Sequence, residues 1–256
     1  MAEPRLYRTT GVVLRRRDFD EADRLITVLT PDRGKVTLLA KGARKINSRK
    51  AAHVDLFRQV DLLVHRGRSF GIVSQAETVR AFPHIGSDLA RMAAAHYLAE
   101  LADTFVGEGQ ESRGVYDLLV AVLDWLEAGG DPRLIQRYFE LHLLDLEGYR
   151  PQLYRCLHCD RWLEEETNLF DAASGGVYCP SCGAGLPQGR RVSVAAQKVL
   201  RFLQRSTVAD CQLLRLKPAL HDEMESLMAE YIRYVAERPP RSRRFIQAVD
   251  SLPAEA

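Results

Sequence analysis

The chain has 256 residues, of which 46% are hydrophobic and 27% are charged. These proportions, with only 17 glycines, 11 prolines and five cysteines, exclude a disordered chain, a collagen and a disulfide-dense scaffold. No apolar run approaches the roughly 18 residues of a membrane span, so we expect no membrane contact. Because the N-terminal segment also lacks a signal peptide, we expect a cytoplasmic, nucleoid-associated protein whose cysteines bind metal rather than pair.

The formal net charge of +2 is unevenly distributed along the chain. Residues 1–80 contain 17 basic and 9 acidic side chains, whereas residues 81–256 contain 19 basic and 25 acidic ones. A basic N-terminal part attracts polyanions, although a basic face also serves simply to keep a small domain soluble. The distribution favours a nucleic acid as the partner of the N-terminal part.

Short strands separated by turns are predicted in the first eighty residues, because Val, Leu, Ile and Thr alternate there with polar residues. The expected strands are residues 7–17, 24–30, 34–41, 56–66 and 70–79. Residues 43–54 show no alternation, so we expect a helical turn or a mobile loop between the third and fourth strands. Five strands with such an element indicate an OB-fold barrel.

Helices are predicted from Ser87 onward, where the hydrophobic period changes from two residues to about 3.6. Ser87 and Asp131 are the expected N-caps of the first and third helices, and Pro132 occupies the first turn of the third. The expected helices cover about residues 87–107, 112–128, 131–148, 194–204 and 218–237. The fold class is therefore α+β: an OB-fold (1–80), a helical domain in two parts (81–150 and 191–256), and a small insert (151–190).

Four cysteines in the insert form two pairs with metal-ligand spacing. Cys156 and Cys159 make one CxxC knuckle, and Cys179 and Cys182 make a second after 19 intervening residues. Two knuckles supply the four thiolates of a tetrahedral zinc site, and a complete shell leaves no position for a reacting water. We expect one structural Zn²⁺. Two redox dithiols, or a site that has lost its metal, are the alternatives.

Two further residues near these motifs have simpler interpretations. His158 lies inside the first knuckle and is expected to be exposed, since four thiols already complete the shell. Cys211 is expected to be a small core residue. The chain has no G-x-x-x-x-G-K-[ST] or H-E-x-x-H motif, and it lacks the Pro-Cys-x-x-Cys of a zinc deaminase, because the order here is Cys179-Pro180. We expect a binding protein, not an enzyme, and a zinc-dependent nucleotide-modifying enzyme is disfavoured.

Basic residues cluster on the predicted strands and on the loop after the third strand. The candidate phosphate contacts are Arg15, Arg17, Lys35, Lys41, Arg44, Lys45, Arg49, Lys50, Arg66 and Arg68. A groove lined by such residues binds the backbone of a nucleic acid with release of counterions, whereas any single member is also explained as a solvated surface residue. Aromatic residues among these cations are few, so binding should be indifferent to base sequence.

Longer motifs carry a resemblance to a known family. They are Gly11-Val-Val-Leu, Arg17, Glu21-Ala-Asp-Arg-Leu, Leu29-Thr-Pro, Gly34-Lys-Val, Leu39-Ala-Lys-Gly-Ala-Arg-Lys, Ser48-Arg49 and Phe57, then Leu146-Glu-Gly-Tyr149-x-Pro151 before the two knuckles, with Phe170 and Gly175-Gly176 between the knuckles. In these segments the chain resembles the RecO family of bacterial DNA repair and recombination mediators. The resemblance covers nearly the whole chain and weakens after about Arg205.

The resemblance implies an OB-fold, a helical domain and a zinc-binding insert. It also implies a protein that binds single- and double-stranded DNA and anneals complementary strands. Its implied partners are the single-stranded DNA-binding protein SSB and RecR, and it acts with RecR in loading RecA. In this chain Asp160 stands where many zinc knuckles have glycine.

Charge segregation adds an expectation about the SSB contact. The acidic, aromatic-ended tail of SSB should need a local pocket with cations at its rim, because the body at 81–256 is acidic. Arg133 and Arg137 are candidates for that rim, and ordinary solvated arginines are the alternative. A second interpretation of the whole chain is an adaptor that acts mainly through protein contacts, with the barrel as a docking module.

Overall fold

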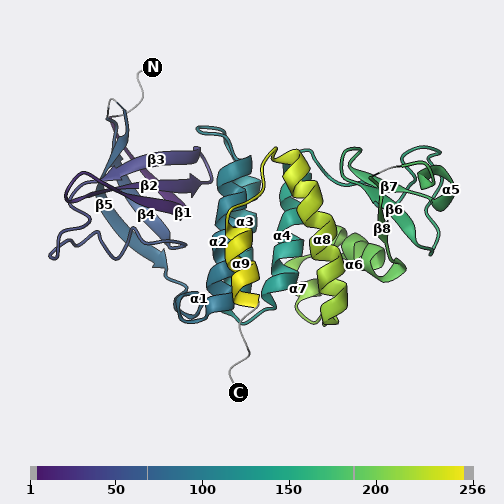
Figure 1. Ribbon diagram of the computed structural model, residues 1–256. Helices are drawn as coiled ribbons and strands as arrows, with labels where there is room; N and C mark the ends of the chain where they lie inside the picture. The colour runs from purple at the N-terminus through teal and green to yellow at the C-terminus, as the bar shows by residue number, and fades with distance from the viewer. Residues whose placement is uncertain (1–4, 68, 187, 251–256) are drawn as a thin grey trace. The chain divides into compact units, whose positions relative to one another are not determined.

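A computed structural model describes residues 5–67, 69–186 and 188–250. Its N-terminal strands are β1 (Leu6–Phe19), β2 (Asp23–Thr30), β3 (Gly34–Ala40), β4 (Gln59–His65) and β5 (Gly71–Arg80), as Figure 1 shows. They form a closed barrel in the order β1-β2-β3-β5-β4, and the long β1 closes it by pairing with both β2 and β4. Only the β3–β5 pair is parallel. This order confirms the predicted five-stranded OB-type barrel.

The interior of the barrel follows the alternation of each strand. On β3, Leu38 and Ala40 are buried in the barrel core and Val36 packs against it, as the sequence predicts. Lys35 and Thr37 lie on the opposite face of the strand. Apolar residues of the loop after β3, Ala43 and Val54, also belong to this core. The core therefore holds the connection from β3 to β4 at two places, Ala43 and Val54.

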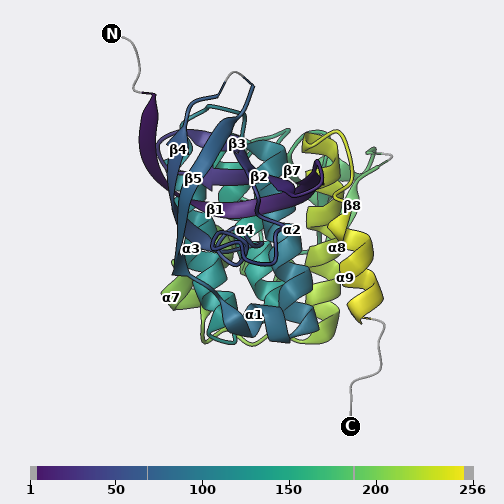
Figure 2. The same ribbon diagram turned by 90° about the vertical axis from the view of Figure 1, so that its left-hand side faces the viewer.

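Helices cover part of the outer surface of the barrel. Leu25 and Leu29 of β2 are 2% and 0% exposed, yet they lie outside the barrel core cluster. Helices α2 (Leu89–Phe105) and α3 (Arg113–Glu127) pack against β1, and α3 also contacts β2 (Figures 1 and 2). The outer face of β1 and β2 is consequently a packing surface for helices.

The helical part contains more elements than the sequence predicts. The further helices are α1 (Pro83–Ser87), α4 (Pro132–Leu146), α5 (Pro180–Gly183), α6 (Val194–Arg205), α7 (Val208–Cys211), α8 (Pro218–Val235) and α9 (Ser242–Asp250). Asp131 caps α4 as expected, because its carboxylate accepts from the backbone N–H of Arg133 at 2.9 Å. The first long helix begins one residue later than expected, since Asp88 rather than Ser87 accepts from the N–H of Arg91.

Two compact units divide the chain. The first contains residues 1–128 and 244–256, and the second contains residues 129–243. The helices expected to form one body are therefore shared between the two units. In the second unit, α4, α6 and α8 pack together, and the insert forms a sheet of β6 (Asn168–Asp171), β7 (Gly176–Tyr178) and β8 (Arg190–Val192) in the order β7-β6-β8.

Among the residues that the structure describes, no helix combines the length and the apolar character needed to cross a bilayer.

Lowering the pH should destabilise the first unit through His96. Its imidazole lies edge-to-face with Phe57 and Phe245, at centroid distances of 4.9 and 6.2 Å. Burial lowers the pKa of His96, Glu100 raises it and Arg16 lowers it further, with a net depression. At acidic pH the unfolded chain then binds more protons at His96 than the folded chain does. The contribution of neutral His96 to the free energy of unfolding is therefore fully present above the unfolded pKa of about 6.5 and is lost as the pH falls through the folded pKa.

Hydrogen exchange of first-unit amides between pH 7 and pH 5 measures this effect. We expect a smaller loss of protection on acidification in His96→Gln than in the wild type. His65→Gln, at an exposed position of β4, is the matched control and should behave as the wild type. An unchanged pH profile in His96→Gln would contradict the prediction.

Candidate metal centre and nucleic-acid interface

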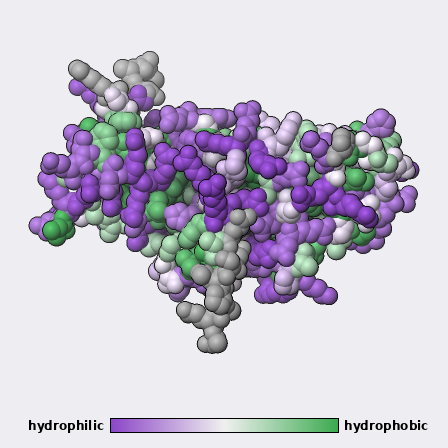
Figure 3. Space-filling view, in the orientation of Figure 1, coloured by the Kyte–Doolittle hydropathy of each residue, from purple (hydrophilic) through white to green (hydrophobic). Residues whose placement is uncertain are grey.

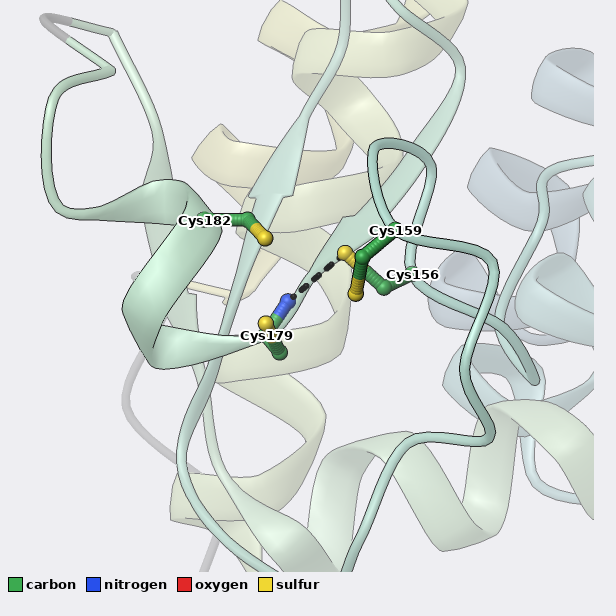
Figure 4. Close-up of side chains that lie close together, drawn as sticks. All are labelled: Cys156, Cys159, Cys179 and Cys182. Carbon is green, nitrogen blue, oxygen red and sulfur yellow. Dashed lines mark hydrogen bonds between the residues drawn. The ribbon is translucent and has the colours of Figure 1, made fainter.

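Four cysteine side chains converge in the insert (Figure 4). Cys156 and Cys159 lie on a tight turn, Cys179 directly follows β7, and Cys182 lies in α5. Their sulfur atoms all lie within 4.8 Å of one another. The backbone N–H of Cys179 donates to Sγ of Cys156 at 3.4 Å, the dashed line in Figure 4, and so ties one knuckle to the other.

Asp160 completes the turn of the first knuckle with a left-handed backbone (φ 55°). Its N–H donates to the carbonyl of Cys156 at 3.0 Å, and its carboxylate accepts from Arg155 at 2.9 Å. The left-handed conformation is the one that glycine favours, and aspartate is among the residues that tolerate it. The departure from glycine therefore leaves the knuckle intact.

Glycines give the second knuckle its approach to the first. Gly175 has φ 71°, and its N–H donates to the carbonyl of Asp171 at 3.0 Å. A Cβ on Gly176 would lie 2.6 Å from the carbonyl oxygen of Gln152. Gly176 thus lets the chain before Cys179 pair with the segment that leads to Cys156.

The donor set fits a single tetrahedral ion. With a metal–sulfur distance of about 2.3 Å, the edges of an S4 tetrahedron measure about 3.8 Å, so the thiols need only a small contraction. Burial raises the pKa of Cys156, but hydrogen bonds from the backbone N–H groups of Cys159, Cys179 and His158 together outweigh burial. The net result is a pKa lowered to about 6. The thiolate form, which is the metal ligand, is thus favoured at Cys156.

The two other residues considered at this site lie apart from the cluster. His158 is exposed and is not one of the grouped metal-binding side chains. Cys211 is fully buried, and burial, with a smaller contribution from Asp210, raises the pKa of its thiol to about 11. Cys211 is therefore a core residue.

Three of the basic candidates on the barrel are engaged by carboxylates of the same unit. The Nζ atom of Lys35 lies 3.1 Å from Asp103 of α2 and is 14% exposed, and Arg15 lies 3.7 Å from the same carboxylate. Arg44 lies 3.4 Å from Asp18 and also donates to a backbone carbonyl of the β1–β2 turn. Lys35 consequently holds the barrel to α2, a role that its position in sequence does not reveal.

Lys50 also faces the protein. Its ammonium donates to the carbonyl of Val73 on β5 at 3.0 Å, and burial lowers the pKa of Lys50 against a smaller opposing effect of Asp23. This hydrogen bond holds the end of the loop against the barrel.

The remaining candidates are exposed. Within the described ranges, no carboxylate lies at ion-pair distance from Arg17, Lys41, Lys45 or Arg49, and all four are exposed. Arg66 is exposed as well and lines a cavity of about 470 Å³ between the β2–β3 and β4–β5 turns. Arg68 lies outside the described residues. The structure thus brings Lys41, Lys45 and Arg49 together on one loop.

That loop, residues 41–50, is a series of hydrogen-bonded turns. The N–H of Gly42 donates to the carboxylate of Asp23 at 2.7 Å, and the N–H of Arg44 donates to the carbonyl of Ala22 at 2.9 Å. The loop is therefore attached to the β1–β2 turn at the same end of the barrel. Ile46 lies at the tip of this loop and was not identified from the sequence patterns. The feature that could have identified it is an isoleucine among the basic residues of a turn.

Arg133 and Arg137 are not placed as the rim of a surface pocket. Arg137 is 3% exposed and forms a buried ion pair with Glu140, which is 0% exposed. Arg133 is held by Asp222 at 2.5 Å and by Glu225 at 3.1 Å. The helical period places both residues one turn apart, but packing within the second unit buries the face that carries Arg137.

These features define a class: an OB-fold protein with a helical body and, in a small insert, a cluster of four cysteines that could hold a metal ion. Comparison with known proteins identifies the family within this class. The family model described as Recombination protein O N terminal matches residues 1–82, and the one described as Recombination protein O C terminal matches residues 86–244. The chain belongs to the RecO family of DNA repair proteins.

Individual relatives agree over nearly the whole chain. A DNA repair protein RecO of Roseiflexus sp. (strain RS-1) is 43% identical over 245 residues, which cover 96% of this chain and 86% of the relative. One from Symbiobacterium thermophilum is 34% identical over 249 residues, 96% of this chain and 98% of the relative. One from Dehalococcoides mccartyi (strain 195) is 32% identical over 249 residues, 97% and 98% of the two chains.

Proposed function

We propose that the protein is a recombination mediator that binds single- and double-stranded DNA and anneals complementary strands. The observation that carries the proposal is the loop at residues 41–50. There Lys41, Lys45 and Arg49 form no ion pair with any carboxylate of the residues that the structure describes. Cations that are not neutralised within the protein are available for phosphates. Membership of a family of DNA repair proteins supports DNA as the polyanion.

DNA should approach the end of the barrel that carries this loop. Part of the surface of β1 and β2 is covered by α2 and α3, so the strand face is not fully open to a ligand. Arg17, on β1 near the β1–β2 turn to which the loop is attached, would extend the cationic track. Contacts made mainly with phosphates carry no base preference, which suits a protein that must act on any strand.

The metal that we propose for the four cysteines is one structural Zn²⁺. Four thiolates are soft donors that suit zinc, and a complete sulfur shell gives the ion no position at which to activate water. We accordingly propose a non-enzymatic role for the protein. The ion would hold together the two knuckles and the β6–β8 sheet.

The proposed partners follow from the family. The mediator would act in the cytoplasm on SSB-coated DNA, together with RecR, and assist the loading of RecA. The SSB tail would bind at a site other than Arg137, because that side chain is buried with Glu140.

Removing the three loop cations should flatten the salt dependence of DNA binding. The slope of log affinity against log salt is negative, and each phosphate on a single strand that is no longer neutralised reduces its magnitude by roughly 0.7. The triple variant Lys41→Ala, Lys45→Ala, Arg49→Ala should therefore have a slope smaller in magnitude by about 2. Fluorescence anisotropy of a labelled single strand over a salt series measures the slope. Lys35→Ala is the matched control and should keep it, because Lys35 is already paired with Asp103. Equal slopes in the triple variant and the wild type would remove the loop from the interface.

Annealing of SSB-coated complementary strands tests the proposed activity itself. The wild type should accelerate annealing, and the triple variant should do so more slowly at moderate salt. A wild type that binds SSB but neither binds nor anneals DNA would support the adaptor instead. Turnover of any nucleic acid would contradict the non-enzymatic role.

A further inference from the structure

Ile46 is the most exposed large hydrophobic side chain among the described residues, at 103% of its reference area. It lies at the tip of the loop at residues 41–50, the first part of the connection from β3 to β4. In the view of Figure 3, hydrophilic side chains predominate over the barrel, with small hydrophobic patches between them. A fully solvated isoleucine contributes nothing to the core, so its presence has to be explained by something other than folding.

The local backbone makes isoleucine an unusual choice at this position. The N–H of Ser48 donates to the carbonyl of Lys45 at 2.9 Å, which places Ile46 and Asn47 at the two corners of a turn. Turn corners favour Gly, Pro, Asn, Asp and Ser, and a β-branched apolar residue has no local advantage there. Asn47 fits that preference and Ile46 does not.

The base of the loop is fixed while its tip is exposed. Ala43, near the start of the loop, and Val54, four residues beyond its end, are 1% and 0% exposed in the barrel core. The backbone of Gly42 and Arg44 is hydrogen-bonded to the β1–β2 turn, and Lys50 is hydrogen-bonded to β5. These anchors hold the tip away from the barrel surface, as a wedge must be held if it is to enter a ligand.

The side chains around Ile46 indicate what kind of ligand it enters. Lys45 precedes it, Arg49 follows three residues later, and Lys41 lies at the start of the same loop, all exposed. A nucleic acid combines phosphates outside with apolar base faces inside, and apolar side chains such as Ile insert between base steps beside such cations. A lipid surface also attracts cations and apolar groups, but it normally takes a broad apolar helix face rather than one residue.

We propose that Ile46 inserts between neighbouring bases of a DNA strand whose phosphates are held by Lys45 and Arg49. This inference rests on the proposed DNA binding and adds a contact to the bases that the cations alone do not provide. Insertion would unstack the bases locally without reading their identity. In an annealing protein, unstacked bases are more accessible for pairing with a complementary strand.

The test uses the full chain with a single strand that contains 2-aminopurine, whose fluorescence rises when it is unstacked. The wild type should raise the fluorescence on binding. Ile46→Ala should abolish most of that rise and weaken binding about five- to tenfold at every salt concentration, since the variant buries less apolar area against the bases. The salt slope should remain that of the wild type, because every charge is kept.

Two controls separate insertion of Ile46 from a general effect of surface hydrophobicity and from the effect of the neighbouring charges. Leu213→Ala alters another exposed hydrophobic residue, 86% exposed in the second unit, and should change neither signal. Lys45→Ala, Arg49→Ala should lower the salt slope, which checks the proposed DNA binding independently of Ile46.

Contradictory outcomes are equally distinct. If Ile46→Ala matches the wild type in affinity and in 2-aminopurine fluorescence while the wild type shows salt-dependent binding, the wedge is wrong and the DNA interface stands. If the wild type binds no DNA, both are wrong. If Ile46→Ala binds DNA normally but loses binding to anionic lipid vesicles, the occupant is a membrane and the proposal is overturned.

Discussion

Replacement of Cys179 by serine should release the proposed Zn²⁺ and unfold the insert at residues 151–190 while the barrel stays folded. Cys179 is 1% exposed and bonds through its N–H to Cys156, so it is the buried link between the knuckles. Structural zinc contributes about 10–16 kcal/mol of apparent binding energy in small zinc domains, and the insert has few apolar residues with which to replace it. Zinc content by elemental analysis and amide hydrogen exchange along the chain would show both effects.

His158→Ala is the matched control for this prediction. His158 lies in the first knuckle but is exposed, so the variant should retain one zinc and wild-type protection of the insert. Unfolding in Cys179→Ser should end at the contact between the insert and α8, where Phe170 packs edge-to-face on Tyr231 at 5.6 Å. Protein purified without chelator that contains no zinc, or a Cys179→Ser variant with full protection of the insert, would contradict the structural role.

Local patterns in the sequence predict most elements of the fold. Alternation and turn residues locate all five barrel strands, because each strand buries one face in the common core. The strand order depends on pairing between distant segments such as β1 and β4, and it is reached only through the five-strand count and the family resemblance. Helix α9 was missed because it follows Pro239-Pro240, which indicate only where the preceding helix ends.

The candidate sites were predictable to the extent that they are local in sequence. The four cysteines are defined by spacing, and the structure brings their sulfur atoms together. Lys35 was expected to face a phosphate, but its partner Asp103 lies on α2, 68 residues away, and no pattern around Lys35 indicates that pairing. Arg137 was a candidate for the rim of a surface pocket because it lies one helical turn from Arg133, whereas packing around α4 buries it with Glu140.

Replacement of Glu140 by leucine should destabilise the second unit by about 3–5 kcal/mol. Glu140 and Arg137 lie on α4, their side chains are 0% and 3% exposed, and they form an ion pair three residues apart. Removing one member of a buried pair weakens the compensation of the other charge, and water cannot restore it at a buried position. Urea unfolding followed by circular dichroism, with hydrogen exchange to assign the loss to the second unit, would measure the effect.

A double variant distinguishes the pair from simple loss of packing. Arg137→Met with Glu140→Leu removes both charges and keeps apolar volume, so it should be clearly more stable than Glu140→Leu alone. Asp145→Ala is the surface control on the same helix: Asp145 pairs with Arg150 at 3.0 Å, both are more than 40% exposed, and such pairs contribute about 0.2–1 kcal/mol. If Glu140→Leu costs no more than Asp145→Ala, the buried pair does not stabilise α4. If the double variant falls below the single one, the two charges do not compensate one another, and Arg137 would be stabilised by other groups of the protein.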